Sequence, residues 1–236
     1  MSPVDAEIAA SLAQSARVIN TPQTIDETLD AIVRATLVSV PGFDHVGISV
    51  INRDGTIETA AATDQVVWEL DDLQYRIDEG PCVSAMREAQ VVAVPDIRHE
   101  QRWSRYVPEA VTRTGLRAQL AVHLYVNDKT LGGLNLYSTR SAEIDPGAIQ
   151  AAELFATHAA LALARARRES ELNDAIVTRQ EIGMAIGLTM ARYNLDSERA
   201  FQYLVRASST SQIKIRDIAR QIIQTTNAER QPKTRD

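Results

Sequence analysis

The C-terminal quarter of the chain carries three successive apolar stripes at helical spacing, separated by short polar breaks. The third stripe is the most regular and comprises Ile215, Ile218, Ala219, Ile222 and Ile223. The breaks contain residues that cap helices, with Asp196 in the first and the serine-rich run 208–211 in the second. The pattern predicts a compact three-helix unit. Such a unit is too small to be very stable alone, so we expect dimerisation or an attached domain to support it.

The preceding part of the chain mixes helical and strand-like patterns. Residues 5–40 are amphipathic at helical spacing, with a break at Thr21-Pro22 and an end at Pro41-Gly42. The strand-like segments that follow are 44–51, 56–62, 91–94, 116–126 and 131–137. The first two flank an Asp-Gly turn, as in a β-hairpin, and short helices are predicted at 64–75 and 81–89. This order predicts an α+β fold with a mostly antiparallel sheet.

A long helix is predicted to join the two parts. No proline follows Pro146 until past Gln224, and an Ala/Leu-rich run continues into the first C-terminal stripe. A helix over 146–190 would be about 65 Å long, which favours pairing in a dimeric coiled coil. Arg165, Arg168 or Glu169 interrupts the seam, so the coiled coil would be short and imperfect and could change register with a signal. We expect domains at 1–165 and 166–230 that share this helix, and a flexible tail at 231–236.

Composition adds few constraints. The 236 residues have an ordinary apolar content of 44%, no apolar run near the ~18 residues of a membrane span, and no signal-peptide pattern at the N-terminus. A single cysteine, Cys82, excludes an internal disulfide framework. We therefore expect a cytoplasmic protein without membrane contact.

Charge is distributed unevenly within the net value of −6. Residues 1–164 hold 12 Lys and Arg against 22 Asp and Glu, a net of −10, whereas residues 165–236 hold 13 against 9, a net of +4. A basic helical tail on an acidic body favours a polyanion-binding module, although an excess of this size also arises by ordinary variation.

The C-terminal motifs resemble the ANTAR domain. The matching residues are Ala185, Gly187, Met190, Ala191, Arg192, Tyr193, Ala200, Phe201, Leu204, Ser208 and the run Lys214 to Ala219. Asn194 stands where Gly is common, and Gln212 where Asn is common; Asn tolerates left-handed backbone readily. The resemblance implies RNA binding and control of transcription termination.

The N-terminal part, about 25–165, resembles a GAF domain of the kind found ahead of ANTAR domains in actinobacteria. The matching pieces are Ala62-Thr63-Asp64, Leu73-Gln74-Tyr75, Gly80-Pro81-Cys82, Trp103 and the run Leu131 to Ser138. The resemblance implies a central antiparallel sheet with helices on one face and a small-molecule pocket on the other, roofed by residues 64–110.

Enzyme motifs are missing from the sequence. It has no phosphate-binding glycine loop, and its four histidines lack metal-ligand spacing. Some GAF relatives reduce free methionine sulfoxide with several cysteines, but one cysteine cannot form the intramolecular disulfide that such turnover implies. We expect no catalysis, metal or known cofactor.

Two sets of candidate site residues follow. In the GAF-like part, Cys82 at a helix start is either a redox-sensitive thiol or a small buried hydrophobe. Gln119, His123 and Tyr125 share a strand face and either line a pocket or are covered by helices. Trp103 is either a pocket lid or an anchor for its loop.

In the ANTAR-like part, basic side chains can bind phosphate, Tyr193 can stack a loop base or pack as a hinge aromatic, and the small Ala185 and Gly187 allow close approach of RNA or tight helix crossing. Gln212 and Lys214 are expected to act with the serine-rich run at a helix N-terminus. The candidate RNA-binding residues are Arg179, Ala185, Gly187, Arg192, Tyr193, Arg206, Ser208, Gln212, Lys214, Arg216 and Arg220.

Together these features predict a homodimeric antitermination regulator. By the ANTAR resemblance, such a dimer would bind paired stem-loops in a nascent leader RNA, under control of a ligand, redox change or partner protein acting at the GAF-like domain. Two alternatives remain open: a DNA-binding protein, and a purely dimerising signalling module. Asp217, on the exposed face of the would-be recognition helix, counts against DNA.

Overall fold

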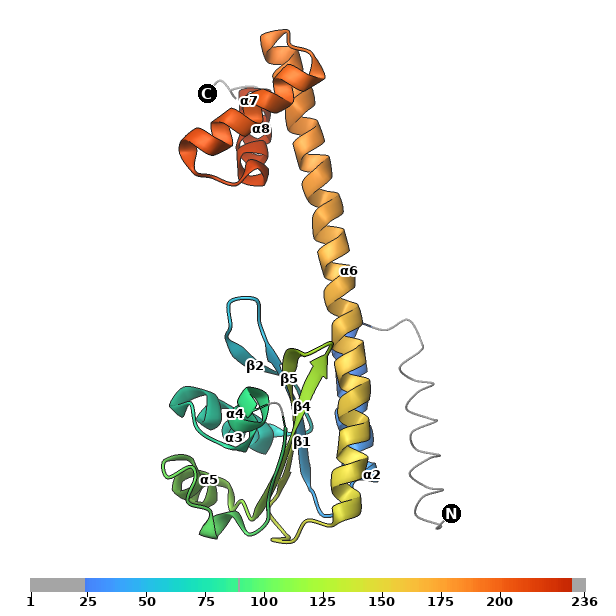
Figure 1. Ribbon diagram of the computed structural model, residues 1–236, viewed down its shortest axis with the longest axis vertical. Helices are drawn as coiled ribbons and strands as arrows, with labels where there is room; N and C mark the ends of the chain where they lie inside the picture. Colours follow the sequence, from blue (N-terminus) through green and yellow to red (C-terminus); the bar gives the residue numbers. More distant parts are fainter. Residues whose placement is uncertain (1–23, 89, 231–236) are drawn as a thin grey trace, which may run out of the picture. The chain divides into compact units, whose positions relative to one another are not determined.

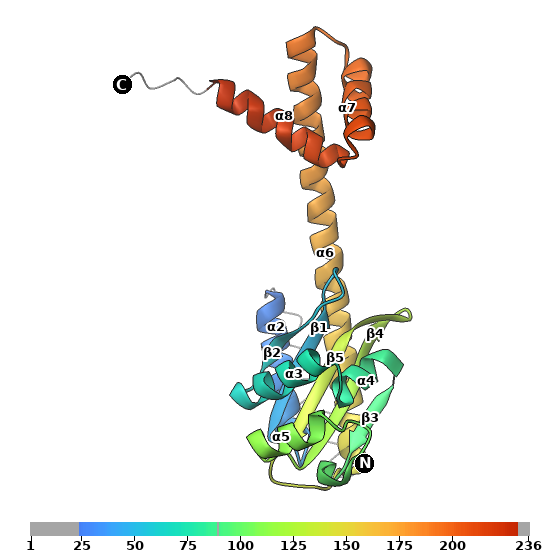
Figure 2. The ribbon, with the colours of Figure 1, turned by 90° about the vertical axis from the view of Figure 1, so that its left-hand side faces the viewer.

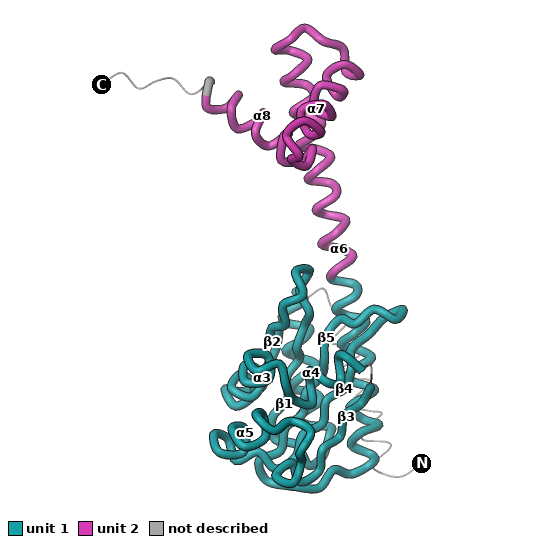
Figure 3. The backbone as a smooth tube through the Cα atoms, turned by 60° about the vertical axis from the view of Figure 1, so that its left-hand side comes forward, with its two compact units in different colours: residues 1–166 teal, residues 167–236 magenta. Residues whose placement is uncertain are grey.

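The computed structural model describes residues 24–88 and 90–230, so the expectations for 5–23 and for the tail 231–236 lie outside the described residues. The chain divides into two compact units, Met1–Ala166 and Arg167–Asp236 (Figure 3).

Unit 1 is built on a five-stranded antiparallel sheet in the order β2-β1-β5-β4-β3. The strands are β1 (His45–Ile51), β2 (Ile57–Ala62), β3 (Val91–Val94), β4 (Ala118–Val126) and β5 (Lys129–Ser138). The α+β fold and the antiparallel sheet are confirmed. The two hairpins form where the chain tolerates left-handed backbone: Gly55 has a φ of +88°, and Asn127 and Asp128 have φ of +49° and +61°.

Helices cover both faces of this sheet (Figures 1 and 2). On one face lie α3 (Gln65–Ile77), α4 (Pro81–Glu88), the short 3-10 helix η1 (Ile97–His99) and α5 (Tyr106–Thr114). On the other lie α2 (Ile25–Ser39) and the first part of α6 (Pro146–Tyr193). The alternation in β4 divides the core accordingly, because Leu120 and Val122 join the α2–α6 cluster whereas Ala121 joins the α3–α5 cluster.

The long helix α6 changes character along its 48 residues. Its first turns pack on unit 1 through small residues such as Ala152, Ala156 and Ala160, together with Phe155. Residues 168–177, by contrast, are all exposed. An α-helix exposed around its whole circumference gains little from packing, so the described residues do not give this stretch the usual source of helix stability.

Unit 2 consists of the C-terminal part of α6 with α7 (Ser197–Ser211) and α8 (Ile215–Arg230). Its fully buried core is small and draws on all three helices: Ala185, Leu204, Ile218 and Ala219. Asp196 caps α7 by accepting a hydrogen bond from the Arg199 N–H at 2.8 Å, as predicted. Asn194, in the turn before it, has a φ of +52°.

One predicted boundary is wrong. The serine-rich run 208–211 does not cap the third helix, because it forms the last turn of α7. The Ser211 hydroxyl donates to the carbonyl of Ala207, and the Ser208 hydroxyl donates to the carbonyl of Ile213 at 2.5 Å. Serine hydroxyl groups often donate hydrogen bonds to backbone carbonyls within a helix or just after its end. These two serines therefore stabilise the α7–α8 turn.

Candidate functional site

The basic residues of unit 2 differ in whether a carboxylate neutralises them. The Nε of Arg220 donates to both carboxylate oxygens of Glu181, at 2.9 Å each, and thereby ties α8 to α6. The Arg216 guanidinium lies 3.8 Å from the carboxylate of Asp217, and Arg220 approaches that carboxylate at 3.5 Å. The positive charge of α8 is therefore partly balanced within the helix itself.

Three other cations are differently placed. Arg179 in α6, Arg206 in α7 and Lys214 before α8 are exposed, and within residues 24–88 and 90–230 none forms an ion pair with a carboxylate. Unpaired exposed cations are the groups best able to bind phosphate, because no intramolecular bond has to break. Arg192, near the end of α6, is also exposed.

The two small residues of the motif have different surroundings. Ala185 is fully buried in the core shared by the three helices, so it serves helix packing. Gly187 is exposed, and a Cβ placed there would meet nothing within 4 Å. Helix crossing within the chain therefore does not require glycine at 187. A partner that approaches α6 closely would require it.

Tyr193 and Tyr203 form an exposed aromatic pair. Tyr193 lies at the end of α6 and Tyr203 in α7, with ring centroids 5.3 Å apart and ring planes tilted by 35°. Both keep a substantial exposed fraction, 50% for Tyr193 and 43% for Tyr203. The sequence pattern indicated Tyr193 but gave no signal for Tyr203, which meets it only because the α6–α7 turn brings the two helices together.

The remaining candidates of unit 2, Ser208 and Gln212, act on the backbone of the α7–α8 turn. Gln212 ends α7 in a left-handed conformation with a φ of +59°, and its side chain lies 3.5 Å from the carbonyl of Ser209. Asn adopts this conformation more readily than Gln, so a conformational preference explains why Asn suits this position.

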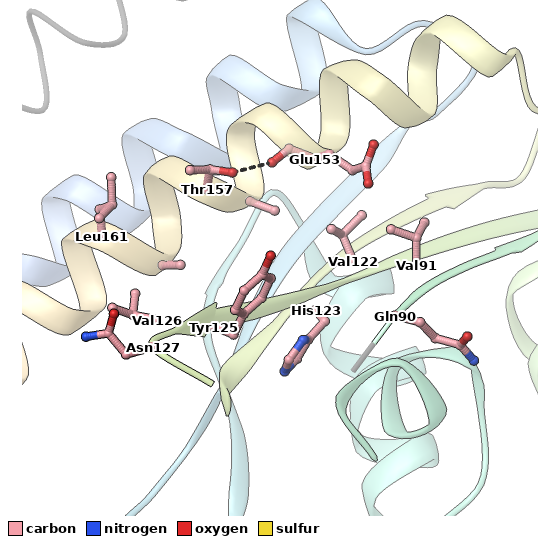
Figure 4. A pocket seen from close by; sticks show the side chains of 12 residues that line it. Gln90, Val91, Val122, His123, Tyr125, Val126, Asn127, Glu153, Thr157 and Leu161 are labelled. Atoms are coloured by element: carbon pink, nitrogen blue, oxygen red, sulfur yellow. Dashed lines mark hydrogen bonds between the residues drawn. The ribbon is translucent and has the colours of Figure 1, made fainter. Parts of the chain in front are cut away.

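In unit 1, His123 and Tyr125 line a cleft of about 510 Å³ between strands β3–β4 and α6 (Figure 4). Their rings stack at 5.0 Å, and the His123 imidazole hydrogen-bonds the Thr130 hydroxyl at 2.9 Å. Burial lowers the pKa of His123, so the imidazole is neutral near pH 7. The cleft lies outside the expected roof of residues 64–110 except at Gln90 and Val91.

Gln119 does not join that cleft. It is fully buried between the sheet and α3–α5, where its carbonyl accepts from the Tyr106 hydroxyl at 2.8 Å. It belongs to a buried polar cluster between the sheet and α3–α5, whose members are Ser49, Thr59, Asp71, Gln74, Tyr75, Cys82, Tyr106, Gln119, Asn135 and Tyr137.

Asp71 is the charged centre of this buried polar cluster. It accepts hydrogen bonds from Asn135 at 3.0 Å, from Thr59 at 2.8 Å and from the Tyr137 hydroxyl. Burial raises the pKa of Asp71 to about 6, against the opposing effect of these hydrogen bonds. The other amide atom of Asn135, Oδ1, has no partner among the described residues. Sequence patterns missed Asp71, although it recurs with Val67 and Gln74 on the buried face of α3.

Cys82 and Trp103 are both buried and contribute to packing in the core of unit 1. Cys82 is fully buried, and burial raises the pKa of its thiol to about 12. The thiol is thus protonated at neutral pH, which opposes the redox interpretation and agrees with the buried-hydrophobe alternative. Trp103 is buried, and its indole N–H donates to the Ser84 hydroxyl at 3.0 Å, while Arg102 lies over its ring. It anchors its loop on the core.

The two units match two domain families. A model of the GAF domain matches residues 22–164, more than half of the chain, and a model of the ANTAR domain matches residues 170–223. The chain belongs to the GAF domain family and carries an ANTAR domain. No curated protein matches it by sequence.

Solved structures resemble the GAF unit in fold. The GAF domain of a phosphoenolpyruvate-protein phosphotransferase from Coxiella burnetii has a TM-score of 0.59 at 15% identity, covering 72% of this chain and 99% of that one. The corresponding domain from Acinetobacter gives 0.57 at 14%, covering 71% and 97%. A free methionine-R-sulfoxide reductase from Neisseria meningitidis, solved with its substrate, gives 0.56 at 15%, covering 72% and 95%. At these identities the likeness shows the fold alone.

The domain pair places the chain among regulators. ANTAR domains are RNA-binding antitermination modules, and GAF domains are sensory, so both are regulatory and not catalytic in kind. Within the described residues no group of three or more His, Cys, Asp or Glu could hold a metal ion. By length and composition alone, helix α6 is long and apolar enough to cross a membrane, and 44% of its apolar stretch is buried inside the protein. Both domains are typical of soluble regulators.

Proposed function

We propose that the protein is a transcription antitermination regulator that binds paired stem-loops in nascent leader RNA under control of its GAF domain. By holding the stem-loops, the ANTAR domain prevents a terminator hairpin from forming. The observation that carries the proposal is the ANTAR match over 170–223, within which Arg179, Arg206 and Lys214 are exposed cations without carboxylate partners among the described residues. Such cations supply the salt-dependent phosphate affinity.

The charge pattern of α8 supports RNA over duplex DNA. A helix that reads the major groove presents donors and acceptors to base edges along its exposed face. Here Arg216 and Arg220 both lie near Asp217, and Arg220 is also bonded to Glu181. The negative charge of Asp217 on this face opposes insertion into a groove lined by phosphates.

A homodimer formed through α6 completes the proposal. Over residues 168–177 the helix is exposed all round, and it presents Leu172, Ile176 and Val177 without apolar cover from the described residues. A second copy of α6 would bury these side chains and place two ANTAR domains on paired stem-loops. Leu172→Glu with Ile176→Glu should convert the dimer to monomer in sedimentation equilibrium. The exposed Glu171→Gln is the matched control, and a monomeric native chain would contradict dimerisation.

The signal reaches the GAF domain through a small ligand or a partner protein. The protonated, buried Cys82 makes a thiol signal the weakest of the three routes. The cleft beside His123 and Tyr125 has the volume of a small-molecule site. Its polar groups come mainly from Gln90, Asn127 and Glu153, with one carboxylate among them, which favours a neutral or cationic ligand.

Read-through of a terminator tests the function directly. In single-round transcription on a template whose leader encodes tandem stem-loops overlapping a terminator, the native protein should raise read-through. Lys214→Ala combined with Arg206→Ala should abolish the increase. Lys129→Ala, which removes an exposed cation from the GAF unit, is the matched control and should act like the native chain. Unchanged read-through with native protein, with and without cell extract as a source of signal, would contradict the proposal.

A further inference from the structure

The Tyr193–Tyr203 pair occupies a position where apolar packing ends. Along α6, Ala185 and Thr189 are buried, and Tyr193 continues the same stripe one turn further. Leu204 is the last fully buried contribution of α7, and Tyr203 precedes it. The two rings shield each other at 5.3 Å and leave about half of each side chain exposed. Packing within the domain therefore accounts for only part of the aromatic surface.

Two cations share the face of α7 that carries Tyr203. Arg199, Tyr203 and Arg206 recur at i, i+4 and i+7, so they share one face of the helix, and all three are exposed. Arg206 has no carboxylate partner among the described residues, and Arg199 makes only a long contact of 3.5 Å with Asp196. This face alternates a cation, an aromatic ring and a cation.

A third cation comes from α6. The pKa of the Tyr203 hydroxyl is raised chiefly by its hydrogen bond with Tyr193, and the positive charge of Arg192 acts in the opposite direction. Arg192 directly precedes Tyr193 at the end of α6 and is exposed. Three arginines around an exposed aromatic pair give a site with positive charge at its rim and a stacking surface at its centre.

Surfaces of this composition suit unpaired nucleotides. Single-stranded RNA is bound by cations that follow the backbone and by aromatic side chains on which bases stack. Resting on the proposed function, we propose that the Tyr193–Tyr203 pair stacks an unpaired loop base of the RNA while Arg192, Arg199 and Arg206 bind the phosphates beside it. A purine, with its larger ring surface, is the better occupant. Tyr203 then determines which loops the protein accepts.

The test uses the full-length protein and stem-loop RNAs that carry 2-aminopurine at one loop position at a time. Stacking on an aromatic ring quenches the fluorescence of this base. The 2-aminopurine fluorescence should therefore fall on binding at one loop position. Tyr203→Leu should remove that quenching and weaken binding by roughly 5- to 150-fold, as expected for loss of one stacked base. Tyr203→Phe should keep both the quenching and the affinity. The slope of affinity against salt should stay the same in both variants.

Phe201→Leu is the matched control. It makes the same kind of change on the same helix, but Phe201 lies on a different face from Arg199 and Arg206 and is also partly exposed. It should bind RNA like the native chain. Circular dichroism and sedimentation of each variant show whether fold and oligomeric state are kept.

The outcomes separate this inference from the proposed function. If the native chain binds stem-loop RNA but Tyr203→Leu binds and quenches equally well, the inference fails and the proposed function stands. If Tyr203→Leu is folded but dissociates the native dimer, the pair is a protein interface and the inference also fails. If the native chain binds no stem-loop RNA, in the presence or absence of cell extract, both fail.

Discussion

Arg220 of α8 contacts Glu181 of α6 through both carboxylate oxygens, at 2.9 Å each, across 39 positions of sequence. The Glu181 side chain is only 19% exposed, so this contact lies at the edge of the ANTAR core. A cation held in this way contributes to the arrangement of the helices more readily than to phosphate binding.

Arg220→Ala should therefore destabilise the ANTAR domain while Lys214→Ala should not. Removing the guanidinium leaves the mostly buried carboxylate of Glu181 without this partner, which lowers the thermal midpoint of the domain. RNA affinity of the folded fraction should change little. Combining Arg220→Ala with Glu181→Ala measures the coupling between the two residues. Arg220→Ala would instead mark an RNA contact if it left the thermal midpoint unchanged and weakened binding as Lys214→Ala does.

Gly187→Ala should have opposite effects on stability and on RNA binding. Alanine in a helix interior is favoured over glycine by about 1 kcal/mol, and the added methyl meets nothing in the domain. The free energy of unfolding should rise, whereas RNA binding should weaken if RNA approaches α6 at this point. Gly183→Ala is the matched control, because its added methyl also meets no atom. Equal RNA affinity of both variants and the native chain would place position 187 outside the interface.

The stability of the GAF domain should fall as pH rises from about 4 to 6. The native pKa of Asp71 is raised from the ordinary value of 3.8 to about 6, so in this window the native state holds a proton that the unfolded state has lost. Across this window the free energy of unfolding should therefore fall by about 3 kcal/mol. It should level off above pH 6, where Asp71 is deprotonated in both states. Urea unfolding at pH 4.5 and 7.5 measures the change.

Asp71→Asn should lack this pH dependence, because the amide does not ionise. Asp72→Asn, at the exposed neighbouring position of α3, should retain the native dependence. A native protein whose stability is level or increases across this window, with the same profile in Asp71→Asn, would show that the fold does not raise the pKa of Asp71.

Cys82 should resist thiol reagents in the native protein. Its thiol is fully buried and protonated, so it reacts only when the domain opens. Because the chain contains one cysteine, labelling reports this site alone. Labelling at pH 7.5 should be slow and should accelerate in urea in step with unfolding. Rapid modification under native conditions would restore the redox signal as a route to the GAF domain.

Local patterns predicted most of the fold, because periodicity reflects which face of an element is buried. The strand at 91–94 and the stripe from Ile215 to Ile223 illustrate this. The prediction for the serine-rich run 208–211 was wrong because serine hydroxyl groups occur both at helix starts and in last turns. The hydrogen bond from Ser208 to the carbonyl of Ile213, which depends on the folded turn, decides between the two.

The sites were less accessible from sequence, because their chemistry depends on partners distant along the chain. Nothing local distinguishes Arg220, bonded to Glu181, from Lys214, which has no such carboxylate among the described residues. Asp71 is held by partners from β2 and β5, and Tyr203 is recognised only by its contact with Tyr193. Such pairings are properties of the folded chain.

Binding measured as a function of salt tests the central claim most directly. A tandem stem-loop RNA and the same sequence as duplex DNA are titrated with native protein and with Lys214→Ala/Arg206→Ala, using Lys129→Ala as the control. We predict tight, RNA-selective binding whose logarithmic salt slope decreases by about 0.7 to 0.9 for each phosphate contact removed. Equal, weak binding to RNA and DNA by the native chain, unchanged in the double variant and in the presence of cell extract, would contradict the account.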